Sequence, residues 1–167
     1  MPVTAVRKDP ERLTLTIEAE FDASVDRIWE LWTDPRKLER WWGPPTYPAS
    51  FTKHDLAPGS RVEFQMTGPA GDQPYGYWDV LEVEPLRRIL FRDGCANADG
   101  TPDTGLPINT VRVDIEEVAQ GRTRMSIEIA FPSTEAMEQV LVRGTEEGLN
   151  LAVSQIDAIL AEETIQR

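Results

Sequence analysis

The sequence is poor in residues that bind metals or form disulfides. Among 167 residues it has one cysteine, Cys95, and one histidine, His54. A single cysteine cannot form an intrachain disulfide, which fits a reducing cytoplasm. One cysteine and one histidine cannot supply the ligand cluster of a structural zinc site. We therefore predict a cytoplasmic protein with no metal site and no cofactor.

Long apolar runs and an excess of basic residues are also missing. No stretch approaches the roughly 18 apolar residues that a membrane-spanning helix needs, and residues 1–12 lack the apolar core of a signal peptide. Lys and Arg number 17 against 29 Asp and Glu, which gives a net charge of −12. Nucleic acids and anionic membranes are bound mainly through Lys and Arg, so the composition argues against both as partners. We attribute the acidity to solubility.

What is present is typical of one globular domain. Hydrophobic residues make up 40% of the chain and charged residues 28%. This length can bury a sizeable core. We expect a flexible N-terminal segment over residues 1–11 and a single domain over residues 12–163.

Seven segments have the alternating pattern of β-strands. In the first, Leu15, Ile17 and Ala19 face one way and charged or polar residues face the other. Segment 75–84 is apolar on both faces, so its pattern leaves open whether Trp78 or Asp79 points inward. The predicted strands are residues 12–21, 47–56, 61–67, 75–84, 87–92, 110–118 and 122–131.

Helical segments precede the second strand and follow the last. Ser24 is a suitable N-cap for a helix ending at Thr33, and Asp34 with Pro35 begins a second helix reaching about Trp42. Ser133 caps a terminal helical region, which Gly144 divides into a short helix and a longer one over residues 145–162. This order predicts an α+β fold with an antiparallel sheet covered by the terminal helix. Residues 94–107 have no periodicity and form a long loop.

Several motifs resemble one family. Residues 28–35, Ile-Trp-Glu-Leu-Trp-Thr-Asp-Pro, and residues 41–44, Trp-Trp-Gly-Pro, are similar to signatures of the family named after the activator of the heat-shock chaperone ATPase, within the START-like (SRPBCC) superfamily. Residues 58–60 stand where that family has a Gly-Gly turn, with Ser in place of the second Gly. Further matches are residues 98–100, 121–125 and 146–149, and the resemblance covers about residues 12–163.

This resemblance implies a helix-grip fold, in which a seven-stranded curved antiparallel sheet wraps around the long C-terminal helix. It also implies a cavity for a small apolar ligand between sheet and helix. Small residues such as Gly148 on the inner helix face either let the helix approach the sheet or leave room for the ligand. The candidate ligand-binding residues are Trp42, Phe64, Met66, Trp78, Phe91, Ile129, Leu149, Ala152 and Ile156.

Three functions follow as hypotheses. The first is binding of an apolar small molecule, with the loop over residues 94–107 as a lid. The second is a chaperone ATPase co-factor acting through protein–protein contacts, although we expect no counterpart of the co-chaperone's separate N-terminal domain. The third is a cyclase or dehydratase, for which the possible interior polar groups are Asp79, His54, Tyr75 and Tyr77. No catalytic residue is assigned, binding is favoured over enzymatic activity, and a monomer or a homodimer is expected.

Overall fold

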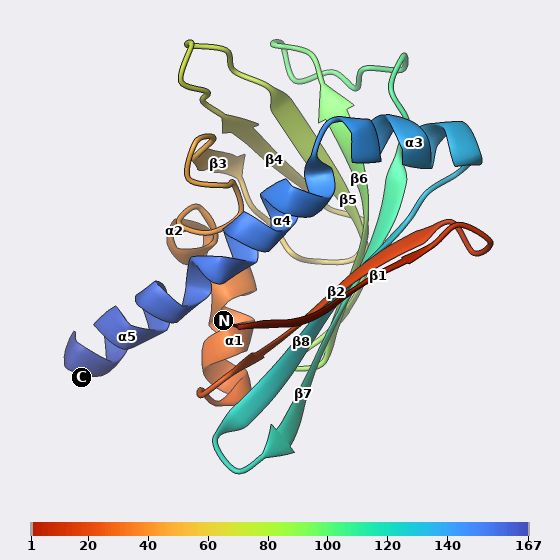
Figure 1. Cartoon of the computed structure of the whole chain (residues 1–167). Coiled ribbons are helices and arrows are strands. Elements are labelled where there is room, and N and C mark those ends of the chain that lie inside the picture. Colours follow the sequence, from red (N-terminus) through yellow and green to blue (C-terminus); the bar gives the residue numbers. More distant parts are fainter. Residues whose placement is uncertain (1, 167) are drawn as a thin grey trace.

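The computed structural model describes residues 2–166 and shows a curved sheet with helices on one side (Figure 1). The strands are β1 (Val3–Asp9), β2 (Thr14–Phe21), β3 (Ala49–Lys53), β4 (Arg61–Met66), β5 (Tyr75–Glu84), β6 (Arg88–Ala96), β7 (Asn109–Ala119) and β8 (Arg122–Ala130). The helices are α1 (Val25–Thr33), α2 (Pro35–Leu38), α3 (Thr134–Val142), α4 (Thr145–Ser154) and α5 (Ile156–Gln166). The α+β class predicted from the sequence is confirmed. None of the helices in the described part combines the length and apolar character needed to cross a membrane.

The sheet has eight antiparallel strands in the order β1-β2-β8-β7-β6-β5-β4-β3 and is not closed. The prediction of seven strands was therefore wrong. The additional strand is β1, in the segment predicted to be flexible, and it pairs with β2 through Val6 opposite Ile17. The sequence did not predict β1, because charged residues interrupt its apolar alternation. Edge strands commonly carry such charges. One of these, Lys8, forms an ion pair of 3.0 Å with Glu146 of α4.

One face of the sheet is apolar and buried under the helices. Strand β2 alternates as its sequence predicted, with Leu15, Ile17 and Ala19 buried. The register continues this face across the sheet, since Leu15 lies opposite Ile129 and Ile129 opposite Val111. We call this the inner face.

The orientation of β5 is settled by its neighbours. Trp78 and Val80 are buried on the inner face. Asp79 points to the outer face, where its carboxylate accepts hydrogen bonds from Arg61 Nε at 2.7 Å and Nη2 at 3.1 Å. The Arg61 guanidinium also lies 4.5 Å from the centre of the Tyr77 ring, so it covers this ring on the outer face. Of the two alternatives left open by the sequence, the structure selects Trp78 inward.

The helix boundaries follow the predicted caps. The Arg27 and Ala136 backbone N–H groups donate to the Ser24 and Ser133 hydroxyls, and Arg36 N–H donates to Asp34. Helix α2 was predicted to reach about Trp42 but ends at Leu38. The chain turns after Leu38 and runs into the Gly-Pro-Pro sequence of residues 43–45, which cannot continue a helix.

The terminal helical region covers the sheet and then leaves it. Helix α4 contacts β1 and β2, whereas α5 continues past α1 and α2 (Figure 1). The predicted single helix over residues 145–162 is interrupted at Gln155, whose amide donates to Gly43 O at 2.8 Å. The ends of the region are thus fixed differently, α4 by the sheet and α5 by the helix pair.

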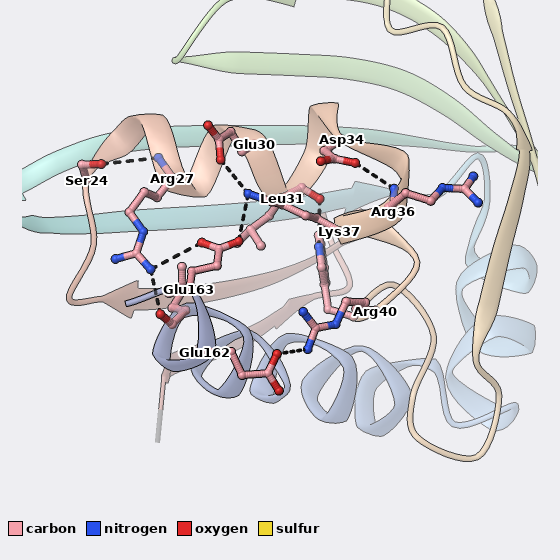
Figure 2. Close-up of polar contacts among 12 residues, drawn as sticks. Ser24, Arg27, Glu30, Leu31, Asp34, Arg36, Lys37, Arg40, Glu162 and Glu163 are labelled. Carbon is pink, nitrogen blue, oxygen red and sulfur yellow. Dashed lines mark hydrogen bonds and ion pairs between the residues drawn. The ribbon is translucent and has the colours of Figure 1, made fainter. Parts of the chain in front are cut away.

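Charged side chains hold α5 against α1 and α2 (Figure 2). Arg27 and Lys37 both reach the Glu163 carboxylate, at 3.4 and 2.9 Å. Arg27 also donates to the Leu160 carbonyl at 2.7 Å. Arg40 pairs with Glu162 further out. Glu163 is 12% exposed, and its two partners are largely buried. This cluster is therefore better shielded from water than the Arg40–Glu162 pair.

Candidate functional site

Most of the inner face consists of apolar rows that run across the strands. Val80 lies opposite Phe91, Phe91 opposite Val111, and Val111 opposite Ile129. All four are buried, at 8% exposure or less. These side chains form the central part of the core.

The adjacent row is polar. Asp93 of β6 lies directly opposite Trp78 of β5 on one side and Asn109 of β7 on the other. Directly opposed residues in antiparallel strands place their side chains on the same face. Asp93 also lies two residues after buried Phe91 on the same strand, so it shares the inner face. The row Trp78–Asp93–Asn109, here called the polar row, therefore adjoins the apolar core.

Asp93 has no partner for its carboxyl. It makes no hydrogen bond or ion pair within the described part of the chain, and burial raises its pKa to about 7. Desolvation disfavours the charged form of an acid, so the neutral carboxyl is favoured up to this pH. A carboxyl kept neutral near neutral pH can donate as well as accept a hydrogen bond.

The other two members of the polar row also carry unpaired atoms. Asn109 is only 9% exposed, and its Oδ1 has no hydrogen-bond partner. Trp78 is fully buried, and its indole Nε1–H has no acceptor. Buried polar atoms are nearly always paired, and leaving one unpaired costs about 1–3 kcal/mol. Two such atoms in one row mark this region as unusual for a core.

Aromatic rings pack around Trp78, at one end of the polar row. Trp78 stacks on Phe91 with ring centres 4.3 Å apart, and Trp42 packs edge-on against Trp78 at 4.9 Å. Phe64 lies 5.9 Å from Trp78. Trp41, by contrast, is fully buried in the core, and its Nε1–H donates a hydrogen bond to the Leu31 carbonyl oxygen. The partly buried Trp42 thus provides the more accessible edge of this aromatic wall.

The structure places eight of the nine predicted ligand-binding residues on the inner face or on helices α4 and α5, and Trp42 in the bend that follows α2. Six are buried: Phe64, Trp78, Phe91, Ile129, Ala152 and Ile156. Three are half-buried and pack against the core: Trp42, Met66 and Leu149. Phe64 and Phe91 pack directly against Trp78 of the polar row.

The helix side has room beside Gly148. A Cβ built there would have no other heavy atom within 4 Å. By contrast, a Cβ at Gly76 on the sheet would lie 2.5 Å from the Phe64 ring. Gly148 lies one turn before buried Ala152, at the edge of the covered helix face. Gly148 is itself half-buried, so this open space lies at the margin of the helix cover.

Asp93 and Asn109 were missed from the sequence. Strand β6 was predicted to end at Arg92, because Asp-Gly is typical of a turn. The structure extends it to Ala96. The available signal was the alternation of Ile89, Phe91, Asp93 and Cys95, which continues through the apparent turn. Burial, with Asp93 nearby, raises the pKa of the Cys95 thiol, so this cysteine favours its neutral form.

The four polar groups considered for catalysis do not belong to the polar row. Asp79 and Tyr77 lie on the outer face with Arg61. Tyr75 lies opposite Gln65 and Ala96, also on the outer face. His54 is half-buried, and its Nε2 lies 2.9 Å from the Trp32 carbonyl oxygen.

The long loop lies partly on the outer face. Residues 98–100 line a hollow of about 170 Å³ together with Thr52, Glu63 and Gln65. This part of the loop does not cover the inner face as the predicted lid would. A second hollow, of about 330 Å³, lies on the outer face among charged residues that include Arg88 and Asp114. Neither hollow lies between the sheet and α4; the inner features that favour a ligand are the polar row and the space beside Gly148.

The fold and this inner face define the class of the protein. A curved antiparallel sheet covered by a C-terminal helical region is the helix-grip architecture of the START-like superfamily. The chain belongs to the family described as Activator of Hsp90 ATPase homolog 1-like protein, whose sequence model matches residues 22–161. Comparison with curated proteins gave no match.

Solved structures support this membership. Protein Ms6760 from Mycobacterium smegmatis is 46% identical, with a TM-score of 0.88 over 95% of this chain and 97% of that one. A protein from Arthrobacter aurescens, solved by NMR, is 44% identical, with a TM-score of 0.91 over 96% and 92%. DynU16, a protein of the dynemicin biosynthetic locus, shares the fold at 19% identity, with a TM-score of 0.65 over 89% of this chain and 47% of its own.

Proposed function

We propose that the protein binds a small, mainly apolar molecule between the inner face of the sheet and α4. The observation that carries this proposal is the polar row, with its unpaired Trp78 Nε1 and Asn109 Oδ1 atoms in the core. Unpaired buried atoms oppose folding, and a ligand that supplies partners explains their presence. The open space beside Gly148, at the edge of the covered face of α4, supports a ligand at this helix.

The surroundings suit an apolar ligand body. Trp42, Phe64 and Phe91 offer stiff apolar surface around the polar row. Ligand sites generally combine such surface with a few polar groups that fix orientation. Each 100 Å² of apolar area removed from water contributes about 2.5 kcal/mol, so the aromatic wall supplies affinity and the polar row supplies orientation.

The direct test is native mass spectrometry of the protein purified from its own host. We expect a population with the added mass of a retained small molecule, lost on denaturation. A library of apolar compounds should also contain some that raise the melting temperature. Gly148→Trp should abolish both effects by filling the space, whereas Leu151→Trp, on the exposed side of the same helix, should preserve them. No retained mass and no stabilising compound would contradict the proposal.

A further inference from the structure

The polar row is a continuous line of three side chains on three neighbouring strands. Asp93 occupies its middle, with Trp78 and Asn109 directly opposite on either side. Asn109 is 91% buried and Trp78 fully buried, so neither reaches bulk water through its unpaired atom. A ligand in contact with Asp93 therefore has Trp78 on one side and Asn109 on the other.

Each member has its own hydrogen-bonding chemistry. An indole N–H only donates, and an amide oxygen only accepts. The Asp93 carboxyl has no basic side chain paired with it, and its burial disfavours a negative charge. The row therefore presents a donor, an acceptor, and between them a carboxyl that can do either.

We infer that the polar row binds a hydroxyl group of a neutral ligand whose apolar body lies against Trp42, Phe64 and Phe91. This inference rests on the proposed function and specifies the class of ligand. A hydroxyl accepts one hydrogen bond and donates another, so it can satisfy the indole N–H and either oxygen acceptor at once. An aromatic alcohol such as a phenol matches both the polar row and the aromatic wall.

Other polar groups match the row less well. A carboxylate brings a second acid against Asp93, whose own pKa is already raised by burial. An ammonium group cannot accept a hydrogen bond, so it leaves the Trp78 N–H unpaired. A ketone only accepts and leaves Asn109 Oδ1 unpaired. A purely apolar ligand leaves both atoms unpaired, at a cost of about 1–3 kcal/mol for each.

The experiment compares four probes that share one ring system: 2-naphthol, naphthalene, 2-naphthoate and 2-naphthylmethylamine. Proton–nitrogen correlation spectra of the full chain give the dissociation constants, with the Trp78 indole resonance assigned through Trp78→Phe. We expect 2-naphthol to bind about 10- to 100-fold more tightly than the other three, and to shift the Trp78 indole N–H.

Variants separate the polar row from general packing. Asn109→Leu should remove most of the preference for 2-naphthol over naphthalene while preserving naphthalene binding. Asp93→Leu provides a second, independent removal if the first variant folds poorly. Thr110→Val is the matched control, since Thr110 follows Asn109 on β7 and points to the opposite face; it should leave the preference unchanged.

The outcomes distinguish the two claims. Equal binding of 2-naphthol and naphthalene, or an unchanged preference in Asn109→Leu and Asp93→Leu, would overturn the hydroxyl assignment and leave the proposed apolar site intact. Tighter binding of 2-naphthoate or of the amine would also overturn it. Failure of all four probes to bind up to their solubility limits would count against the proposed function itself.

Discussion

Asp93 lies directly opposite Asn109 across the β6–β7 pair, and neither side chain is hydrogen-bonded to another described residue. Both belong to the inner face, two residue pairs along from the buried Phe91–Val111 pair. The buried, unpaired Asn109 oxygen lowers the stability of the fold. The half-buried Asp93 carboxyl adds to this effect when it is ionised. A ligand that forms hydrogen bonds with these side chains should therefore raise the stability of the protein.

The first prediction concerns Asp93 and pH. The pKa of this carboxyl is raised from 3.8 to about 7 in the folded protein. Between these values the unfolded chain has released the proton and the folded chain retains it, so the free energy of unfolding falls as pH rises. Asp93→Asn should therefore be more stable than the natural protein at pH 8, by up to about 4 kcal/mol, and nearly equal to it near pH 4.

Urea unfolding at pH 4, 6 and 8 measures this difference. Asp157→Asn, on the exposed side of α5, serves as the control and should show no comparable pH-dependent gain. A difference between Asp93→Asn and the natural protein that stays constant across the three pH values would contradict the assignment.

The second prediction concerns Asn109. Replacing it with leucine, which has the same branched shape, removes the unpaired Oδ1 and adds apolar surface at a site that is 9% exposed. Asn109→Leu should raise the free energy of unfolding by about 1–2 kcal/mol and the melting temperature by roughly 2–8 °C. Calorimetry of the ligand-free protein measures both quantities. A marked loss of stability would show that the amide has a structural partner.

The third prediction concerns Gly148 on α4 and Gly76 on β5. Gly148→Ala adds a methyl group where no atom lies within 4 Å and improves helix propensity, so it should stabilise the protein by about 0.5–1 kcal/mol. Gly76→Ala places its methyl 2.5 Å from the Phe64 ring and should destabilise by about 1–3 kcal/mol. Chemical denaturation of the two variants provides the comparison, and equal effects would contradict the described space.

The fourth prediction concerns Glu163 in the contact between α5 and the helix pair. Burial alone would raise the pKa of this carboxyl, but hydrogen bonding and charge from Lys37, and then from Arg27, outweigh burial and lower it. The ionised form therefore stabilises the fold at neutral pH, and this contribution is lost as pH falls through the lowered pKa. Glu163→Gln should cost about 1–3 kcal/mol at pH 7 and progressively less in acid.

The neighbouring Glu162 provides a matched control for this measurement. Its side chain is 53% exposed and pairs with Arg40, which is 46% exposed. Exposed ion pairs contribute little, so Glu162→Gln should change stability by less than about 1 kcal/mol. If both variants lost the same stability at every pH, the distinct role of Glu163 would be wrong.

The sequence predicted the fold wherever one periodicity dominates. Leu15, Ile17 and Ala19 alternate without exception, and Ser24 and Ser133 are strong caps, so β2, α1 and α3 begin and end close to their predicted positions. Strand β1 was missed because an edge strand has no strict need for apolar alternation. The end of β6 was missed because local turn propensity at Asp-Gly was overridden by pairing with β5 and β7.

The candidate site was predicted only in its apolar part. Residues such as Phe91 and Ala152 are recognisable from periodicity as buried, and the structure places them there. The polar row depends on the register between β5, β6 and β7, which no local pattern specifies. The sequence also left open whether the Trp78 side chain points to the inner face. A strand that is apolar on both faces does not show which face is buried.

The measurement that tests the central claim most directly is a crystal structure of the protein with its retained ligand, or with 2-naphthol. We predict density for the ligand on the inner face, with a hydroxyl within hydrogen-bond distance of Trp78 Nε1 and of Asp93 or Asn109. A ligand bound only on the outer face, or an inner face filled by side chains at saturating ligand, would contradict the account.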